Sequence, residues 1–85
     1  MEEKLKTLRN DIDSIDEQIM KLLEARFELS LEVGKIKVKN DLSIESTSRE
    51  DTILKKANDL KYGYHVKNIY HTLFEESKTL QRNQK

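Results

Sequence analysis

The chain has 85 residues, no proline, no cysteine and only two glycines. This length and composition predict one all-helical domain over residues 1–85, which buries little surface alone and gains stability from a second copy. Without cysteine, a disulfide or a zinc–cysteine site is excluded. The 16 basic residues balance the 16 acidic ones, which excludes a global field that would attract nucleic acid or an anionic membrane.

The chain begins with charged residues and lacks the apolar stretch and the small-residue cleavage site of a secretory signal. Its longest uncharged apolar run is far too short to span a bilayer. With the absence of cysteine, these features predict a cytoplasmic protein.

An unbroken heptad stripe predicts one long helix over about residues 3–38. Its apolar members recur in alternating steps of three and four, at Leu5, Leu8, Ile12, Ile15, Ile19, Leu22, Leu29, Val33 and Ile36. Arg26 takes the remaining position of the stripe, where a guanidinium needs an acidic residue or an anionic ligand as its partner. Gly34 indicates either a close helix approach or a tolerated cost.

The turn-forming residues 39–41 are expected to end this helix. A second helix is predicted over about residues 48–61, with the spacing of a capping box at Thr47 and Glu50, or Ser48 as an alternative cap. Gly63 is placed where a helix commonly has its C-terminal cap.

A third helix is predicted over about residues 64–82. Ser77 and Gln81 continue its apolar face at i, i+4 spacing. The apolar members of that face are Val66, Ile69, Tyr70, Leu73, Phe74 and Leu80.

Three cations of the first helix define a candidate site. Arg26 and Lys37 are close to three turns apart, so their side chains leave the same face about 16 Å apart along the axis. Arg9 lies about 25 Å from Arg26 and cannot join them within one chain. A two-fold axis that crosses an antiparallel helix pair near residue 20 would place Arg9 of one chain opposite residue 31 of the other. A homodimer with two shared sites is therefore predicted.

The candidate groups are guanidinium, ammonium, amide and hydroxyl donors with a single carboxylate, Glu50. Such a set suits a small dianion and favours electrostatic stabilisation over proton transfer or covalent catalysis. His65 and His71 lie on different faces of one helix with no acidic cluster beside them, so no metal site is expected.

Each candidate residue also has a structural interpretation. Arg26 could pair with an acidic residue of a neighbouring helix and set its register. The other two cations of the first helix could be solvated, and the polar pair near the end of the third could lie at an ordinary boundary. Arg49 and Glu50 could be no more than a first-turn pair.

The ordered residues resemble the all-helical class of chorismate mutases over nearly the whole chain. The matching positions are Leu8, Arg9, Ile12, Ile15, Asp16, Leu22, Leu23, Arg26, Val33, Lys37, Arg49, Glu50, Ser77 and Gln81. The resemblance implies a three-helix protomer in an intertwined homodimer that converts chorismate to prephenate by a Claisen rearrangement, without cofactor or metal. It places this step in phenylalanine and tyrosine biosynthesis, and suggests association with another shikimate-pathway enzyme.

The resemblance also implies a role for each site residue. Arg26 and Arg9 of the partner subunit would hold the carboxylates of the substrate, with Ser77 assisting one of them. Lys37 would contact a carboxylate and the ether oxygen. Gln81 would donate a second hydrogen bond to that ether oxygen.

At the ring hydroxyl, the resemblance implies binding by Glu50, with Arg49 beside it. The linker departs from the family's usual pattern, because Ser43 stands where a proline is common and Ser46 where an aspartate is common. If the aspartate acts through its backbone amide, Ser46 can replace it in hydroxyl recognition.

Two other functions fit parts of the pattern. Isochorismate-pyruvate lyase uses the same scaffold and a similar cyclic dicarboxylate, although the Arg49–Glu50 pair favours the mutase. A non-catalytic helical dimerisation or regulatory module would make Arg26 a register residue and Gln81 a surface amide.

Overall fold

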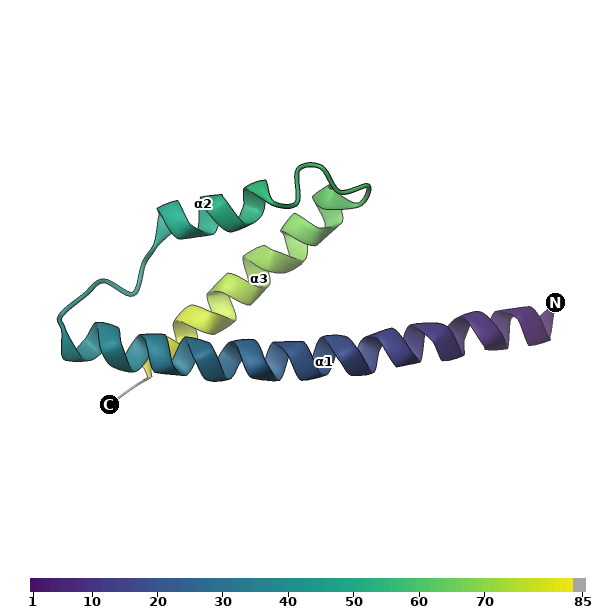
Figure 1. Cartoon of the computed structure of the whole chain (residues 1–85), viewed down its shortest axis with the longest axis horizontal. Coiled ribbons are helices and arrows are strands. Elements are labelled where there is room, and N and C mark those ends of the chain that lie inside the picture. The colour runs from purple at the N-terminus through teal and green to yellow at the C-terminus, as the bar shows by residue number, and fades with distance from the viewer. Residues whose placement is uncertain (84–85) are drawn as a thin grey trace.

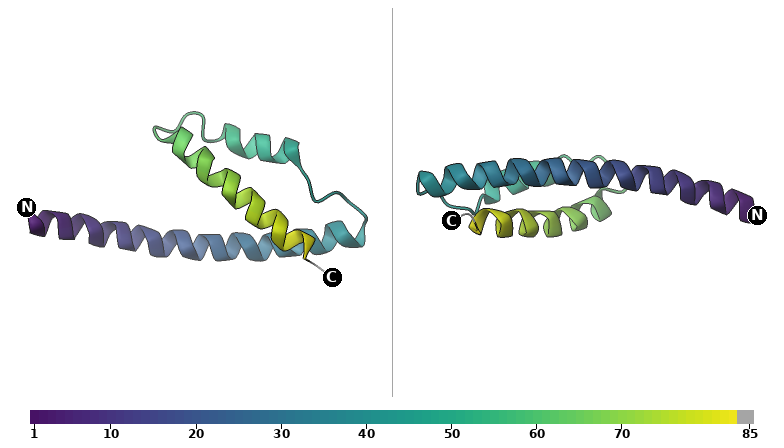
Figure 2. Two further views of the ribbon diagram at one scale, coloured as in Figure 1. Left: turned by 180° about the vertical axis from the view of Figure 1, so that it is seen from behind. Right: turned by 90° about the horizontal axis from the view of Figure 1, so that it is seen from below.

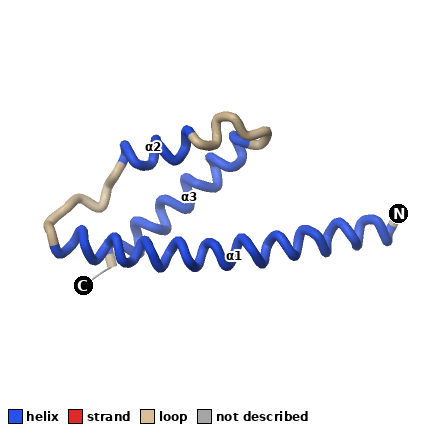
Figure 3. The backbone as a smooth tube through the Cα atoms, in the orientation of Figure 1, coloured by secondary structure: helices blue, strands red, loops and turns tan. Residues whose placement is uncertain are grey.

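The computed structural model describes residues 1–83 and contains three helices. These are α1 (Glu2–Lys39), α2 (Thr47–Lys55) and α3 (Gly63–Arg82), shown in Figure 1. Between them lie only loops and turns (Figure 3). The all-helical prediction is confirmed, and the first and third helices have the predicted bounds to within one residue. The last two residues of the predicted domain lie outside the described residues.

Helix α3 is the element that joins the other two. It packs against both α1 and α2, whereas α1 and α2 do not pack against each other within residues 1–83. It crosses the C-terminal half of α1, and the N-terminal part of α1 extends beyond both other helices (Figures 1 and 2). The molecule therefore has an elongated shape of 57 × 27 × 13 Å.

One face of α1 is exposed to solvent and another packs against α3. All nine aliphatic side chains of the heptad stripe are exposed, with exposed fractions from 43% at Val33 to 70% at Leu22. The buried residues of α1 are instead Ser30 and Gly34, and Gly34 lies against Gln81 of α3. The intramolecular contact thus leaves the heptad stripe without a partner in the protomer.

The core of the protomer is correspondingly small. The buried apolar side chains among the described residues are Ala57, Leu73 and Phe74. Phe74 packs edge-to-face with Tyr70, with their ring centroids 5.7 Å apart. A chain of this length gains little stability from so small a core alone.

The end of α1 is as predicted. Asp41 adopts the left-handed conformation, with φ of 54°, which Asp tolerates better than most side chains do. This turn lets the N–H of Leu42 donate to the carbonyl of Lys37 at 2.8 Å. The Asn40 side chain donates to the Ile36 carbonyl, also at 2.8 Å, so two carbonyls of the last turn are satisfied.

The predicted extent of the second helix, about 48–61, is wrong at its C-terminal end. Helix α2 ends at Lys55, and the chain continues in tight turns in which Leu60 N–H donates to the Ala57 carbonyl. Gly63 is the first residue of α3 rather than a cap, and its φ is not positive. A Cβ on Gly63 would lie 2.1 Å from the Ala57 oxygen. This close approach allows the chain to reverse towards α3.

The predicted capping box at the start of α2 is also wrong. Ser46 is the N-cap, its side chain makes no capping hydrogen bond, and its carbonyl accepts from the N–H of Glu50 at 3.0 Å. Thr47 is already the first helical residue. The Glu50 carboxylate lies 3.4 Å from Lys78 Nζ on α3. Glu50 thus forms an ion pair with a neighbouring helix instead of a local cap.

Gly34 marks the close approach that the sequence left as one of two options. A Cβ there would lie 2.9 Å from Gln81 Cα and 3.1 Å from Gln81 Cβ. Alanine normally stabilises a helix by about 1 kcal/mol over glycine. We expect Gly34→Ala instead to lower the free energy of unfolding by about 1–3 kcal/mol, since α1 and α3 must separate.

Urea unfolding measures this effect, with Glu28→Ala on an exposed position of α1 as the control. A Gly34→Ala chain more stable than the parent would contradict the close approach.

Candidate active site

A cavity of about 230 Å³ lies between α1, α2, α3 and the linker before α2. It exists because α3 holds α2 away from α1. Seven of the eight predicted site residues line it: Arg26, Lys37, Ser46, Arg49, Glu50, Ser77 and Gln81. The eighth, Arg9, is exposed near the N-terminal end of α1 and is not among the residues that line the cavity. Within one protomer Arg9 is therefore absent from the site, as helix spacing predicts.

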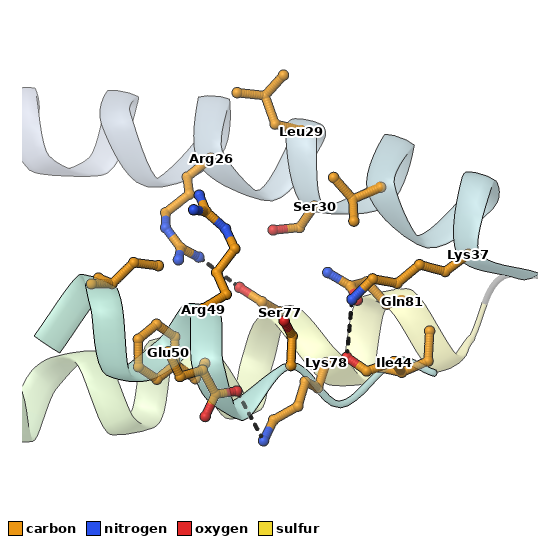
Figure 4. A pocket seen from close by; sticks show the side chains of 14 residues that line it. Arg26, Leu29, Ser30, Lys37, Ile44, Arg49, Glu50, Ser77, Lys78 and Gln81 are labelled. Atoms are coloured by element: carbon orange, nitrogen blue, oxygen red, sulfur yellow. Dashed lines mark hydrogen bonds and ion pairs between the residues drawn. The ribbon is translucent and has the colours of Figure 1, made fainter. Parts of the chain in front are cut away.

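Arg26 turns from the heptad stripe towards α3 (Figure 4). Its Nη1 donates to Ser77 Oγ at 2.8 Å, and its guanidinium carbon lies 5.9 Å from the ring centroids of both Tyr70 and Phe74. Within residues 1–83 no carboxylate approaches it within 4.0 Å. The guanidinium is thus fixed in place by a hydroxyl and two aromatic faces, while its charge is not neutralised.

Lys37 on α1 and Gln81 on α3 lie at the end of the cavity that is opposite Arg26 (Figure 4). Lys37 Nζ donates to the carbonyl of Ile44 in the linker at 3.2 Å. Gln81 is 8% exposed, and its Oε1 has no hydrogen-bond partner among the described residues. A buried polar atom without a partner costs about 1–3 kcal/mol, so this amide is available for a ligand. A half-turn of the amide would place its N–H donors at the same position.

Arg49 and Glu50 enter from the first turns of α2 and point in different directions. The Arg49 side chain points towards α1, and the Glu50 side chain points towards Lys78 (Figure 4). Glu50 is therefore held by α3, whereas Arg49 makes no ion pair with a residue of the described chain.

The charges that line the cavity are unequal. Arg26, Lys37, Arg49 and Lys78 face it with one carboxylate, Glu50. Lys78 is neutralised by acidic neighbours, but the other three cations make no ion pair within residues 1–83. Such a cavity can bind a small molecule with two negative groups and retain donors for a third atom.

Lys78 is a site residue that sequence analysis missed. Its Nζ lies 3.0 Å from Glu75, 3.3 Å from Glu45 and 3.4 Å from Glu50, and its side chain is only 12% exposed. The hydrogen bond to Glu75 raises the pKa of Lys78 above its ordinary value, as do Glu45 and Glu50 to smaller extents, while burial opposes them.

This pKa shift predicts how the stability from the cluster depends on pH. Because the pKa is raised on folding, the contribution is complete below the ordinary lysine pKa of 10.5 and is lost as the pH rises through the higher folded-state pKa. We expect Lys78→Met to be less stable than the parent at about pH 8, and the difference to shrink at about pH 11. Urea unfolding at both values measures it; a constant difference would contradict the assignment.

Ser30 is the second missed residue. It is buried, lines the cavity and stands one helical turn after Arg26. Lys78 follows Ser77 and precedes Gln81 by less than one turn. The same-face spacing to recognised residues was a usable signal for both, because side chains three or four apart on a helix are neighbours.

Within residues 1–83, no group of three or more His, Cys, Asp or Glu side chains is arranged to hold a metal ion. No helix in the part of the chain that the structure describes is long and apolar enough to cross a membrane.

The site residues lie within a part of the chain that matches a known protein family. The family model of chorismate mutase type II matches residues 8–82, which include all eight predicted site residues. The chain belongs to this family. The family expected from the sequence is thus confirmed, and the family's positions include residues of all three helices.

Two individual proteins are also similar in sequence to this chain. The chorismate mutase of Methanocaldococcus jannaschii is 33% identical over 96% of this chain and 88% of its own length. The bifunctional chorismate mutase/prephenate dehydratase of Aquifex aeolicus is 46% identical over 64% of this chain, which corresponds to 15% of that protein. The chain thus spans a small part of that bifunctional relative.

A solved structure agrees with the fold. A conserved hypothetical protein from Pyrococcus furiosus has a TM-score of 0.81 and 38% sequence identity, covering 92% of this chain and 95% of its own. The three-helix arrangement with one long N-terminal helix is therefore shared with an experimental structure.

Proposed function

We propose that this chain converts chorismate to prephenate, as a homodimer with two shared active sites. The observation that carries the proposal is the cavity with a buried amide, one carboxylate and three cations that lack ion-pair partners among residues 1–83. Chorismate offers two carboxylates, an ether oxygen and a ring hydroxyl, so each kind of group in the cavity has a counterpart. The reaction breaks one C–O bond as one C–C bond forms, and no proton or electron leaves the substrate.

The carboxylates select the reactive shape of the substrate. Arg26, already oriented by Ser77 and two aromatic rings, binds one carboxylate, and Ser77 assists. Arg9 of the partner subunit binds the other. Holding both ends of a flexible molecule converts a rare compact conformer into the bound one, which removes an entropic part of the barrier.

Lys37 and Gln81 stabilise the transition state. Negative charge grows on the ether oxygen as the C–O bond lengthens, and these two groups donate hydrogen bonds to it. One preorganised donor of this kind contributes about 3–4 kcal/mol. Two of them approach the roughly 8 kcal/mol that corresponds to about a 10⁶-fold acceleration, so no acid or base is required.

The ring hydroxyl is assigned to the other side of the cavity. Glu50 accepts its hydrogen bond, Arg49 lies beside this carboxylate in the sequence, and Ser46 at the N-cap of α2 lines the same wall. This arrangement distinguishes chorismate from a molecule with its hydroxyl elsewhere on the ring.

The homodimer is supported by the exposed heptad stripe. Nine aliphatic side chains in one row are at least 43% exposed, which is unusual for a monomeric surface. An antiparallel second copy would cover this row and bring its Arg9 between Arg26 and Lys37. The uncovered stripe and the missing arginine are therefore explained by one association.

Two alternatives are less well supported. The isochorismate-pyruvate lyase reaction would use the same carboxylate and ether contacts, but the Arg49–Glu50 pair favours the hydroxyl position of chorismate. A non-catalytic dimerisation module gives no reason for the buried Gln81 oxygen that lacks a partner among residues 1–83.

Product analysis separates these functions. Purified protein is incubated with chorismate and, separately, with isochorismate. Prephenate formed from chorismate, with no pyruvate released from isochorismate, is the expected result. Pyruvate from isochorismate would favour the lyase, and no turnover of either substrate would favour the dimerisation module.

The cellular setting is proposed from the family. We place the chain in the cytoplasm, in phenylalanine and tyrosine biosynthesis, and working without a cofactor or metal. The Aquifex aeolicus relative is a bifunctional chorismate mutase/prephenate dehydratase. The presence of both activities in that relative supports association of this chain with another enzyme of the same pathway.

A further inference from the structure

Lys78 connects three parts of the molecule beside the cavity. It stands on α3, and its ammonium group contacts Glu45 in the linker, Glu50 on α2 and Glu75 one turn back on its own helix. Glu45 also pairs with Arg82 at 2.7 Å. At 12% side-chain exposure, Lys78 is the least exposed member of this ion-pair cluster.

The surroundings of Lys78 differ from those of the other cations at the cavity. Three carboxylates lie within 3.4 Å of its Nζ, whereas Arg26, Lys37 and Arg49 have none among the described residues. A cation shared by three carboxylates has little attraction left for the carboxylates of a substrate. Direct substrate binding by Lys78 is therefore disfavoured.

Its contact with Glu50 is specific to one atom. Lys78 Nζ lies 3.4 Å from Glu50 Oε2. The other oxygen, Oε1, accepts no hydrogen bond from the described residues. One oxygen of the carboxylate is thus held by Lys78, the second has no hydrogen-bond partner within residues 1–83, and Glu50 lines the cavity.

We propose that Lys78 is a positioning residue, which holds the Glu50 carboxylate in the orientation that receives the ring hydroxyl of the substrate. The proposal rests on the function proposed above. A glutamate has three rotatable side-chain bonds, and an anchored carboxylate loses less freedom when the substrate binds. Without Lys78, the carboxylates of Glu45 and Glu75 would also repel Glu50 from this place.

A double-mutant cycle tests whether Lys78 acts through Glu50. Chorismate kinetics are measured for the parent, Lys78→Gln, Glu50→Gln and the double variant. We expect Lys78→Gln to lower kcat/KM about tenfold when Glu50 is present and by less than about twofold in the Glu50→Gln background, because the two residues are coupled. Lys78→Arg, which keeps the charge, is expected to recover most of the activity.

The matched control is Arg82→Gln. It removes the other ion pair of Glu45 but leaves the Lys78–Glu50 contact intact, so kcat/KM is expected to stay within about twofold of the parent. Circular dichroism and thermal unfolding verify the fold of each variant. If Lys78→Gln does not fold, Lys78→Met, which keeps the packing of the side-chain stem, takes its place in the cycle.

The outcomes separate the two proposals. An active parent with equal losses from Lys78→Gln in both backgrounds, or with no loss at all, overturns the positioning role and leaves the mutase function intact. A folded parent that does not convert chorismate overturns the proposed function, and the role of Lys78 in that reaction with it.

Discussion

Replacing Lys37 with alanine is expected to lower kcat for chorismate about 10³-fold. The ammonium group lies at the cavity, held by the Ile44 carbonyl at 3.2 Å, and is assigned to the ether oxygen where charge develops. The substitution removes a full positive charge from this position rather than a neutral donor. Stopped assays that follow the loss of chorismate absorbance measure kcat, and urea unfolding measures stability.

The fold is expected to tolerate this change. Lys37 is only half-buried and makes a single hydrogen bond, so its loss should cost about 1 kcal/mol of stability. Lys35→Ala is the matched control, since Lys35 stands nearby on α1 in an exposed pair with Glu32. Its kcat is expected to stay within about twofold of the parent. A Lys37→Ala variant that keeps a tenth of the parental kcat would rule out the assigned role.

Arg9→Ala and Arg26→Ala are each expected to lower kcat/KM by at least about 10²-fold, because each removes one proposed charged contact with a carboxylate. Arg26 lines the cavity, whereas Arg9 lies near the N-terminal end of α1. If the sites are shared, a mixed dimer of the two variants has one site without either arginine and one intact site.

Mixing the two inactive variants should therefore restore activity. Random exchange at equal concentrations makes half of the dimers mixed, so activity should reach about a quarter of that of the parent. The exchange is verified by mass spectrometry of dimers with one labelled chain. Two Arg26→Ala preparations, exchanged in the same way, provide the control without complementation. No recovery after verified exchange would mean that Arg9 belongs to no shared site.

Much of the fold can be predicted because α1 carries a strict repeat. Alternating steps of three and four set the length and the exposed stripe of this helix, and Arg26 is conspicuous as its one charged member. The polar pair Ser77 and Gln81 likewise stands out on an apolar face of α3. Arg26, Ser77 and Gln81 could therefore be assigned to the cavity because they break a regular pattern, and Lys37 because it is close to three helical turns from Arg26.

The second helix was predicted less well because its signals were local. The apolar spacing of Leu54, Ala57 and Leu60 fits a helix, but it also fits the tight turns that follow Lys55. The decisive contact, between Gly63 and the Ala57 carbonyl, depends on where α3 lies. No pattern in a single segment reports such a contact.

The environment of Glu50 illustrates the same limit. Its spacing from Thr47 matches a capping box, whereas the structure pairs it with Lys78 from another helix. The three-residue spacing of Lys78 from Gln81 indicates that it lies near the cavity, but no sequence pattern indicates its carboxylate partners. Only the approach of α3 to the linker and α2 gathers three carboxylates around it.

The most direct test is the conversion of chorismate by the purified parent chain, followed as loss of ultraviolet absorbance and as prephenate, which acid converts to phenylpyruvate. The mechanism predicts one prephenate for each chorismate consumed, at about 10⁶ times the uncatalysed rate, and the loss of this activity in Lys37→Ala. A folded, dimeric parent that leaves chorismate unchanged would contradict it.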